Sequence, residues 1–152
     1  MTATGLVSAP PGLTDRLVLR ETHVTAGTVI QGELIVTYQG RKPINLNHGC
    51  RPQYAVVVTN HRVPPHVGFT AACGMAPFVI EPGENRLAVT VATTYLACTH
   101  DAWQATSSLP ACLRGQQLMP SLPAGHYEAV LVGDGLPLPA PAPVPVSLSA
   151  AS

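Results

Sequence analysis

The sequence predicts an all-β protein built as one β-sandwich domain. Apolar side chains recur at every second position in several short segments, whereas the spacing of an amphipathic helix is nearly absent. Turn-forming pairs such as Pro82-Gly83 separate most of these segments. Many short strands with frequent turns are typical of a sandwich, whereas alternating strands and helices would indicate a parallel sheet.

Composition and charge exclude several classes of protein. The chain has 152 residues, of which 46% are apolar and only 11% are charged, against about 25% in an average domain. Eight basic and eight acidic side chains cancel, so the positive surplus that a nucleic-acid-binding protein needs is missing. The apolar content argues against a disordered chain, and no apolar run approaches the roughly 20 residues of a membrane span.

The strands are predicted by alternation and by the turns that bound them. The longest candidate, residues 29–38, follows the turn at Ala26-Gly27, and Gly32 inside it is expected to mark a bulge. Residues 54–59 form a compact apolar run that is expected to be buried on both faces. The remaining predicted strands cover residues 17–19, 44–46, 67–70, 78–80, 87–91, 127–132 and 144–148.

One short helix is a candidate within this pattern, with a loop as the alternative. Ser108 could cap residues 109–113, with Pro110 in the first turn and Gly115 after the end.

Prolines occupy every second position between residues 137 and 145. Because alternate N–H groups of a strand point to the same side, these prolines remove every donor along one edge. We expect a linker-like stretch up to Pro141 and then an outer strand at residues 144–148, which could pair on one side only. A stiff polyproline linker is the alternative. The domain is expected to cover residues 15–149, behind a flexible N-terminal segment at residues 1–14.

Four cysteines allow three disulfide pairings: Cys50, Cys73, Cys98 and Cys112. If residues 54–59 and 67–70 pair antiparallel as a hairpin, Cys50 and Cys73 lie nearly opposite each other, close enough to bridge. Cys98 and Cys112 would then staple a long loop onto the sheet. Two disulfides imply an oxidising compartment, so we expect an extracytoplasmic protein, secreted or anchored to the envelope.

Free thiols and a metal site are the alternatives for these cysteines. His48 and His100 each lie two residues from a cysteine, but the short cysteine pairs typical of zinc sites are missing. The sequence also lacks a nucleophile elbow, a metalloprotease helix, a phosphate-binding loop and a dinucleotide fingerprint. His100 and Asp101, with Thr99 and Ser107 nearby, could form a triad, or simply a polar loop. We therefore expect no enzyme activity, no cofactor and no metal.

Two loops are the candidate contact surfaces for a partner. Trp103 lies between Cys98 and Cys112, and large aromatic side chains on constrained loops are favoured binding anchors. Alternatively, Trp103 folds inward and plugs one end of the sandwich. The other loop, residues 60–66, carries Arg62, Val63, Pro64 and Pro65, and its prolines reduce the entropy lost on binding.

Turn and strand motifs carry a family resemblance. Residues 122–127 (LPAGHY) and the alternating segment at 128–132 resemble secreted immunoglobulin-like domains. Pro82-Gly83-Glu84 before residues 87–91 repeats this pattern of a proline-glycine turn followed by an alternating strand. Residues 24–38 look like an early strand of such domains, and residues 49–56 are similar to a segment of small extracytoplasmic domains of high-GC bacteria. The resemblance implies an immunoglobulin-like antiparallel β-sandwich of seven to nine strands, in which Tyr127 forms a tyrosine-corner-like contact.

The expected function is a non-catalytic extracytoplasmic module of the cell envelope, which binds a protein or a cell-wall component or spaces other domains. Neither nucleic acid nor a small-molecule cofactor is an expected partner, and a membrane would be reached only through an anchor missing from this chain. A secreted protease inhibitor that uses residues 60–66 is one alternative, suggested also by a weaker likeness to bacterial proteinase-inhibitor sandwiches. A virion decoration or tail module is another.

Overall fold

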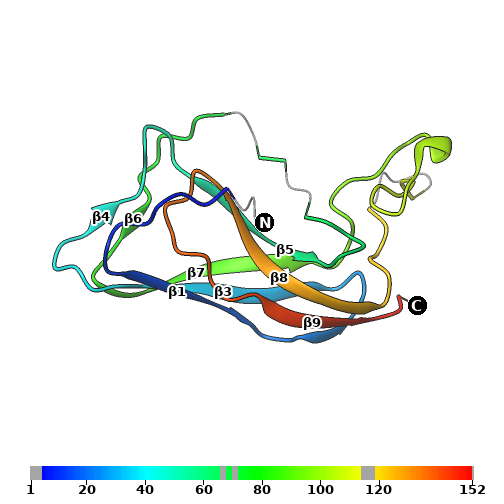
Figure 1. Ribbon diagram of the computed structural model, residues 1–152, viewed down its shortest axis with the longest axis horizontal. Coiled ribbons are helices and arrows are strands. Elements are labelled where there is room, and N and C mark those ends of the chain that lie inside the picture. The colour runs from blue at the N-terminus through cyan, green and yellow to red at the C-terminus, as the bar shows by residue number, and fades with distance from the viewer. Residues whose placement is uncertain (1–4, 66–67, 70–71, 114–118, 152) are drawn as a thin grey trace.

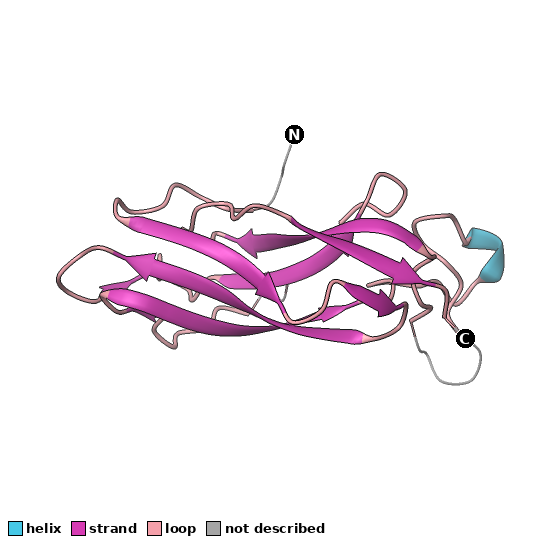
Figure 2. Ribbon diagram, turned by 90° about the horizontal axis from the view of Figure 1, so that it is seen from below, coloured by secondary structure: helices cyan, strands magenta, loops and turns pink. Residues whose placement is uncertain are grey.

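The computed structural model describes residues 5–65, 68–69, 72–113 and 119–151 and confirms an all-β fold with two facing sheets (Figures 1 and 2). One sheet has the strand order β1-β3-β7, the other has the order β2-β9-β8-β5, and β4 and β6 form a small ladder. The strands in the described part are β1 (Leu13–Leu19), β2 (His23–Thr25), β3 (Val29–Tyr38), β4 (Ile44–Asn45), β5 (Gln53–Thr59), β6 (Val79–Ile80), β7 (Gly83–Ala92), β8 (Gly125–Asp134) and β9 (Val144–Ser149).

The alternation read from the sequence builds the core between the two sheets. In β3, Ile30, Leu34 and Val36 are buried and belong to one apolar cluster with side chains from β8 and β9. The expected bulge at Gly32 is wrong, because β3 keeps continuous register with both β1 and β7. Glycine is required there because a Cβ atom at residue 32 would lie 2.5 Å from Val18 O.

Strand β5 is buried on both faces, as expected, since Val56, Val57 and Val58 are all buried. Its partner differs from the prediction. The described residues Gly68 and Phe69 are not in a strand, and β5 instead pairs antiparallel with β8. The expected hairpin is therefore wrong.

Both predicted disulfides are present, and no cysteine in the described part is free. Cys50 and Cys73 have Cα atoms 5.0 Å apart, and those of Cys98 and Cys112 are 4.9 Å apart. Without the expected hairpin, Cys50 meets Cys73 because the adjacent Arg51 N–H donates a 2.6 Å hydrogen bond to Gly74 O. The alternatives of free thiols and cysteine-bound metal are wrong.

The proline-rich segment is part of the core at its start. Leu136 and Leu138 are almost fully buried in the apolar cluster, and Pro137 is also fully buried. The expected linker up to Pro141 is therefore wrong for these residues, because their apolar side chains fill the sandwich. Strand β9 is also not an outer strand, since it lies between β8 and the parallel β2.

The prolines still affect the side of β9 that faces β2. Ser147 N–H donates to Thr22 O at 2.7 Å on that side. The nitrogen of Pro145, two residues earlier, faces the same side of the strand, but it carries no hydrogen to donate. Strand β2 covers only Ser147 to Ser149. The remainder of that edge has no N–H at Pro145 with which another chain could pair.

The start of the chain joins the sandwich earlier than the predicted boundary at residue 15. Strand β1 begins at Leu13, which is buried. Further upstream, Val7 N–H donates to Leu136 O at 3.0 Å, and Leu6 packs against the core. The expected N-terminal segment therefore contributes to the fold from Leu6 onwards.

Tyr127 forms the contact that the family resemblance implies. Its side chain is buried, and its O–H donates a 2.7 Å hydrogen bond to Pro123 O, four residues upstream. Burial raises the pKa of the Tyr127 hydroxyl, which keeps it protonated as a donor. The bond ties the chain entering β8 to the strand itself.

Tyr127→Phe is expected to lower the free energy of unfolding by about 0.5–1.5 kcal/mol, because one buried hydrogen bond is lost while the ring remains. Urea denaturation measures this change. Tyr95→Phe is the matched control, since its O–H bond to Ser107 O is longer, at 3.3 Å, and exposed. An equal loss in both variants would contradict a special role for the Tyr127 contact.

Asp15 places a carboxyl group on the inner face of the edge strand β1. Leu13 and Leu17, two residues away on either side, are buried on the same face. Among the described side chains, Asp15 Oδ2 is the buried oxygen that has no hydrogen-bond partner. Desolvation raises the pKa of Asp15 from 3.8 to about 6. An inward-facing charge on an edge strand disfavours pairing with a strand of another protein molecule. Protection against such aggregation is a role for this unfavourable group.

Asp15→Asn is expected to stabilise the protein by about 1 kcal/mol at pH 7.5 and to leave its stability nearly unchanged at about pH 4. The folded state binds the Asp15 proton more tightly than the unfolded chain, so wild-type stability falls as the pH rises from 3.8 to about 6. The half-exposed position reduces the effect below the full pKa shift. Urea denaturation of both proteins across this range measures it, and parallel pH profiles would contradict the assignment.

Candidate functional site

The Cys98–Cys112 disulfide closes a loop, residues 98–112, which we call the strap. Thr99 N–H donates to Pro110 O at 2.8 Å, and Cys112 N–H donates to Thr99 O at 2.9 Å. This short parallel ladder replaces the helix considered for residues 109–113, which is therefore wrong. The strap extends from one end of the sandwich, the end at which the C-terminus also lies (Figure 1).

Trp103 lies at the apex of the strap, in a single 3₁₀ turn (Ala102–Gln104). Its side chain is 81% exposed, so the alternative in which it plugs the sandwich is wrong. No residue of the strap is buried. The strap is therefore held in shape by its disulfide, its short ladder and hydrogen bonds such as those of Thr106 N–H to Leu109 O and Tyr95 O–H to Ser107 O, while an aromatic side chain is presented to solvent.

The second predicted contact segment folds back onto the sandwich. Asn60 Oδ1 accepts hydrogen bonds from Arg62 N–H and Val63 N–H, both at 2.9 Å, which makes a tight turn. Arg62, Pro64 and Pro65 are exposed, whereas Val63 is buried and belongs to the core. Val63 is thus a core residue and not the exposed contact residue that we expected.

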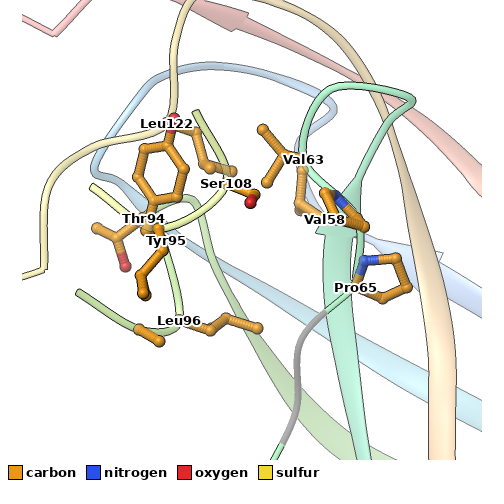
Figure 3. Close-up of a pocket in the computed structure, with 11 residues that line it drawn as sticks. Val58, Val63, Pro65, Thr94, Tyr95, Leu96, Ser108 and Leu122 are labelled. Atoms are coloured by element: carbon orange, nitrogen blue, oxygen red, sulfur yellow. The ribbon is translucent and has the colours of Figure 1, made fainter. Parts of the chain in front are cut away.

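The turn and the strap enclose a cavity of about 290 Å³. Its walls come from residues 63–65, residues 94–97 and Ser108 with Leu109 of the strap, together with Val58 and Leu122. Figure 3 shows Thr94, Tyr95 and Leu96 on one side and Val58, Val63 and Pro65 on the opposite side. None of these lining residues is charged. The structure therefore brings the two predicted contact segments together around one apolar cavity.

Sequence reasoning missed the wall formed by residues 94–97. This segment continues β7 past its last residue and carries no motif. Its one available signal is the alternation of β7, which extends through the buried Thr93. The hydroxyl of Thr93 fixes the segment, because it donates to Thr28 O at 2.6 Å and accepts from Gly27 N–H at 2.8 Å.

Further apolar side chains are exposed close to the strap in the chain. Leu96 is 43% exposed and Leu113 is 49% exposed, and each lies within two residues of a cysteine of the strap. Met119, next to the residue that bonds Tyr95, is also exposed. The strap end thus combines a cavity with exposed apolar side chains, a surface typical of protein-binding sites.

The polar residues considered for catalysis, Thr99, His100, Asp101 and Ser107, all lie within the strap. Thr99 Oγ1 accepts a 3.3 Å hydrogen bond from Asp101 N–H, so this hydroxyl caps a local turn. In the part of the chain that the structure describes, no group of three or more His, Cys, Asp or Glu side chains is placed to bind a metal ion. Within the same residues, no helix has the length and apolar character that crossing a membrane requires.

Comparisons with known proteins add no assignment to this geometry: no protein-family model, no curated protein sequence and no solved structure matches the chain.

Proposed function

We propose that this protein is a non-catalytic extracytoplasmic binding module that holds an apolar side chain of a protein partner in the cavity between the strap and residues 63–65. One observation carries the proposal: two loops that are far apart in the sequence converge on an uncharged cavity, and one of these loops carries a tryptophan that is 81% exposed. Tryptophan side chains and well-packed apolar pockets are both enriched among the hot spots of protein interfaces.

Preorganisation supports the same function. The disulfide fixes the strap, and the hydrogen bonds of Asn60 together with Pro64 and Pro65 fix the opposite wall. Loops that are already ordered lose little conformational entropy on binding, so a small contact area can give useful affinity.

Two disulfides indicate an oxidising, extracytoplasmic environment. A secreted or envelope-anchored module is the finer assignment that we propose on this basis. The Tyr127 contact with Pro123 O supports an immunoglobulin-like relationship, because such corners are typical of that fold.

The alternative of a protease inhibitor has less support. An inhibitory loop must present several consecutive side chains in an extended, exposed form, whereas residues 60–63 form a compact turn with Val63 buried. The geometry of the strap end favours contact through the cavity.

Leu109→Asp is expected to abolish ligand binding, because it places a charge in the uncharged cavity wall. The probes are a library of random linear peptides selected on the wild-type protein and, separately, soluble peptidoglycan fragments. Trp103 is the only tryptophan of the chain, so a blue shift of its emission reports binding at the strap end.

Val79→Asp is the control, since it adds the same charge on an apolar side chain that is 43% exposed in β6, outside the cavity lining and away from the strap. Trp103→Ala, followed by calorimetry, is expected to weaken binding about 30-fold, the effect of a typical interface hot spot. Peptides that bind both aspartate variants and the alanine variant as tightly as the wild type would overturn the proposal. Binding of the peptidoglycan fragments alone would also overturn it.

A further inference from the structure

We infer that the partner enters the cavity as an added β-strand, whose main chain pairs with Thr94 and Leu96 while one apolar side chain fills the cavity. This inference rests on the proposed function and specifies the chemical class of the ligand: an extended peptide segment without charge at its central side chain.

The direction of the main-chain groups in residues 93–97 is the first argument. Tyr95 N–H donates to Pro120 O at 2.9 Å, and Leu122 N–H donates to Thr93 O at 3.0 Å. These two bonds flank an antiparallel bridge between Thr94 and Ser121. The segment is therefore extended up to Tyr95, before a bend at Leu96, and one of its two sides is already paired.

The other side of this segment is open. Because consecutive N–H and C=O groups of an extended chain alternate in direction, those of Thr94 and the N–H of Leu96, which precedes the bend, point away from Pro120. Among the described residues, the main chains of Thr94 and Leu96 form no hydrogen bond. They continue the free edge of β7, which pairs with β3 on its other side only. Unpaired groups along an extended edge are a template for another strand.

The segment on the opposite wall of the cavity cannot pair with this edge as a strand. Strand β5 ends at Thr59, and the chain then turns, with Asn60 N–H donating to Val63 O at 3.1 Å. Pro64 and Pro65, which follow, have no N–H to donate. In Figure 3, Pro65 and Val63 lie across the cavity from Thr94 and Leu96. The gap is therefore bounded by a hydrogen-bonding edge on one side and an apolar wall on the other.

These two walls define what fits between them. An extended peptide can satisfy the main chain of Thr94 and Leu96 along one edge, and its other edge meets Pro64 and Pro65. Its side chains alternate in direction, so those at every second position face the side of the cavity, which has a volume of about 290 Å³. Since no lining residue is charged, the side chain that enters must be uncharged to avoid an unpaired buried charge, and the mostly aliphatic lining favours an apolar one.

The test uses linear peptides of random sequence, displayed between glycine-serine flanks and selected on the wild-type protein. Peptides that bind wild type and Val79→Asp but not Leu109→Asp depend on the cavity and are taken forward. Each is synthesised as a series in which one N-methyl group moves along the main chain. We expect affinity to fall about tenfold at every second position, the loss of one hydrogen bond, and to change little at the positions between.

Amide hydrogen exchange gives a second readout on the protein itself. The Thr94 and Leu96 amides are expected to exchange rapidly in the free protein and to be protected in the complex. The Tyr95 amide, already bonded to Pro120 O, should be protected in both states and is the internal control.

Two failures are distinguishable. If no selected peptide depends on the cavity, the proposed function fails and this inference fails with it. If cavity-dependent peptides bind but tolerate N-methylation at all positions, and the Thr94 and Leu96 amides remain unprotected, the binding function stands and strand addition is overturned.

Discussion

Leu138→Ala is expected to lower the free energy of unfolding by about 2–5 kcal/mol, the cost of removing a large side chain from a packed core. Leu138 lies in the proline-rich segment, yet only 1% of its surface is exposed and it belongs to the main apolar cluster. Urea denaturation with an unchanged slope would attribute the loss to the folded state.

Leu113→Ala is the matched control for this substitution. Leu113 is 49% exposed, so the same chemical change there should alter stability by less than about 0.5 kcal/mol. If Leu138→Ala were as mild as Leu113→Ala, the start of the proline-rich segment would be a linker, and its packing against the sandwich would be wrong.

The double substitution Cys98→Ala and Cys112→Ala is expected to lower the free energy of unfolding by about 3 kcal/mol. This is the free-energy equivalent of the conformational entropy that the cross-link removes from a loop of this size in the unfolded chain. It should also free the strap, because no strap residue is buried and the ladder at its base is short. The Thr99 amide, bonded to Pro110 O, would then exchange faster, while the amides of β3 would remain protected.

Removing the other disulfide separates these two effects. Cys50→Ala with Cys73→Ala also removes a cross-link, over a sequence separation of 23 residues against 14 for the strap. The loss of stability should therefore be similar, whereas exchange in the strap should not change. A strap that stays protected without its own disulfide would show that packing orders it, and the argument from preorganisation would be lost.

Most of the strands could be predicted because their signals are local. Alternation over β3 and β8 and the turns at Pro82-Gly83 and Gly125 are visible in any short window of sequence. The pairing of Cys50 with Cys73 was correct although the hairpin invoked for it does not exist. The choice of β8 as the partner of β5 is a long-range property, which spacing within a loop cannot reveal.

In the proline-rich segment, the proline content and the apolar alternation predict different structures. Leu136 and Leu138 alternate with the prolines in the same way as the apolar residues of the strands, and both are buried. Composition favoured a linker because proline cannot donate to a sheet. Burial of a side chain does not require that donor, so the apolar alternation was the better guide.

The candidate site was predictable only in parts. Trp103 and the turn at residues 60–65 stood out by residue type and by proline content. Their convergence, and the wall formed by Thr94 and Leu96, depend on how two sheet edges approach each other in three dimensions. No spacing in the sequence encodes that approach.

The position of β9 has a consequence for biosynthesis. The strand formed by residues 144–149 lies between β2, near the start of the chain, and β8. The four-stranded sheet can therefore be completed only after residues 144–149 have left the ribosome, since its inner strand follows the other three in the sequence. Until then the edges of β2 and β8 that β9 joins remain unpaired, open to pairing with another chain.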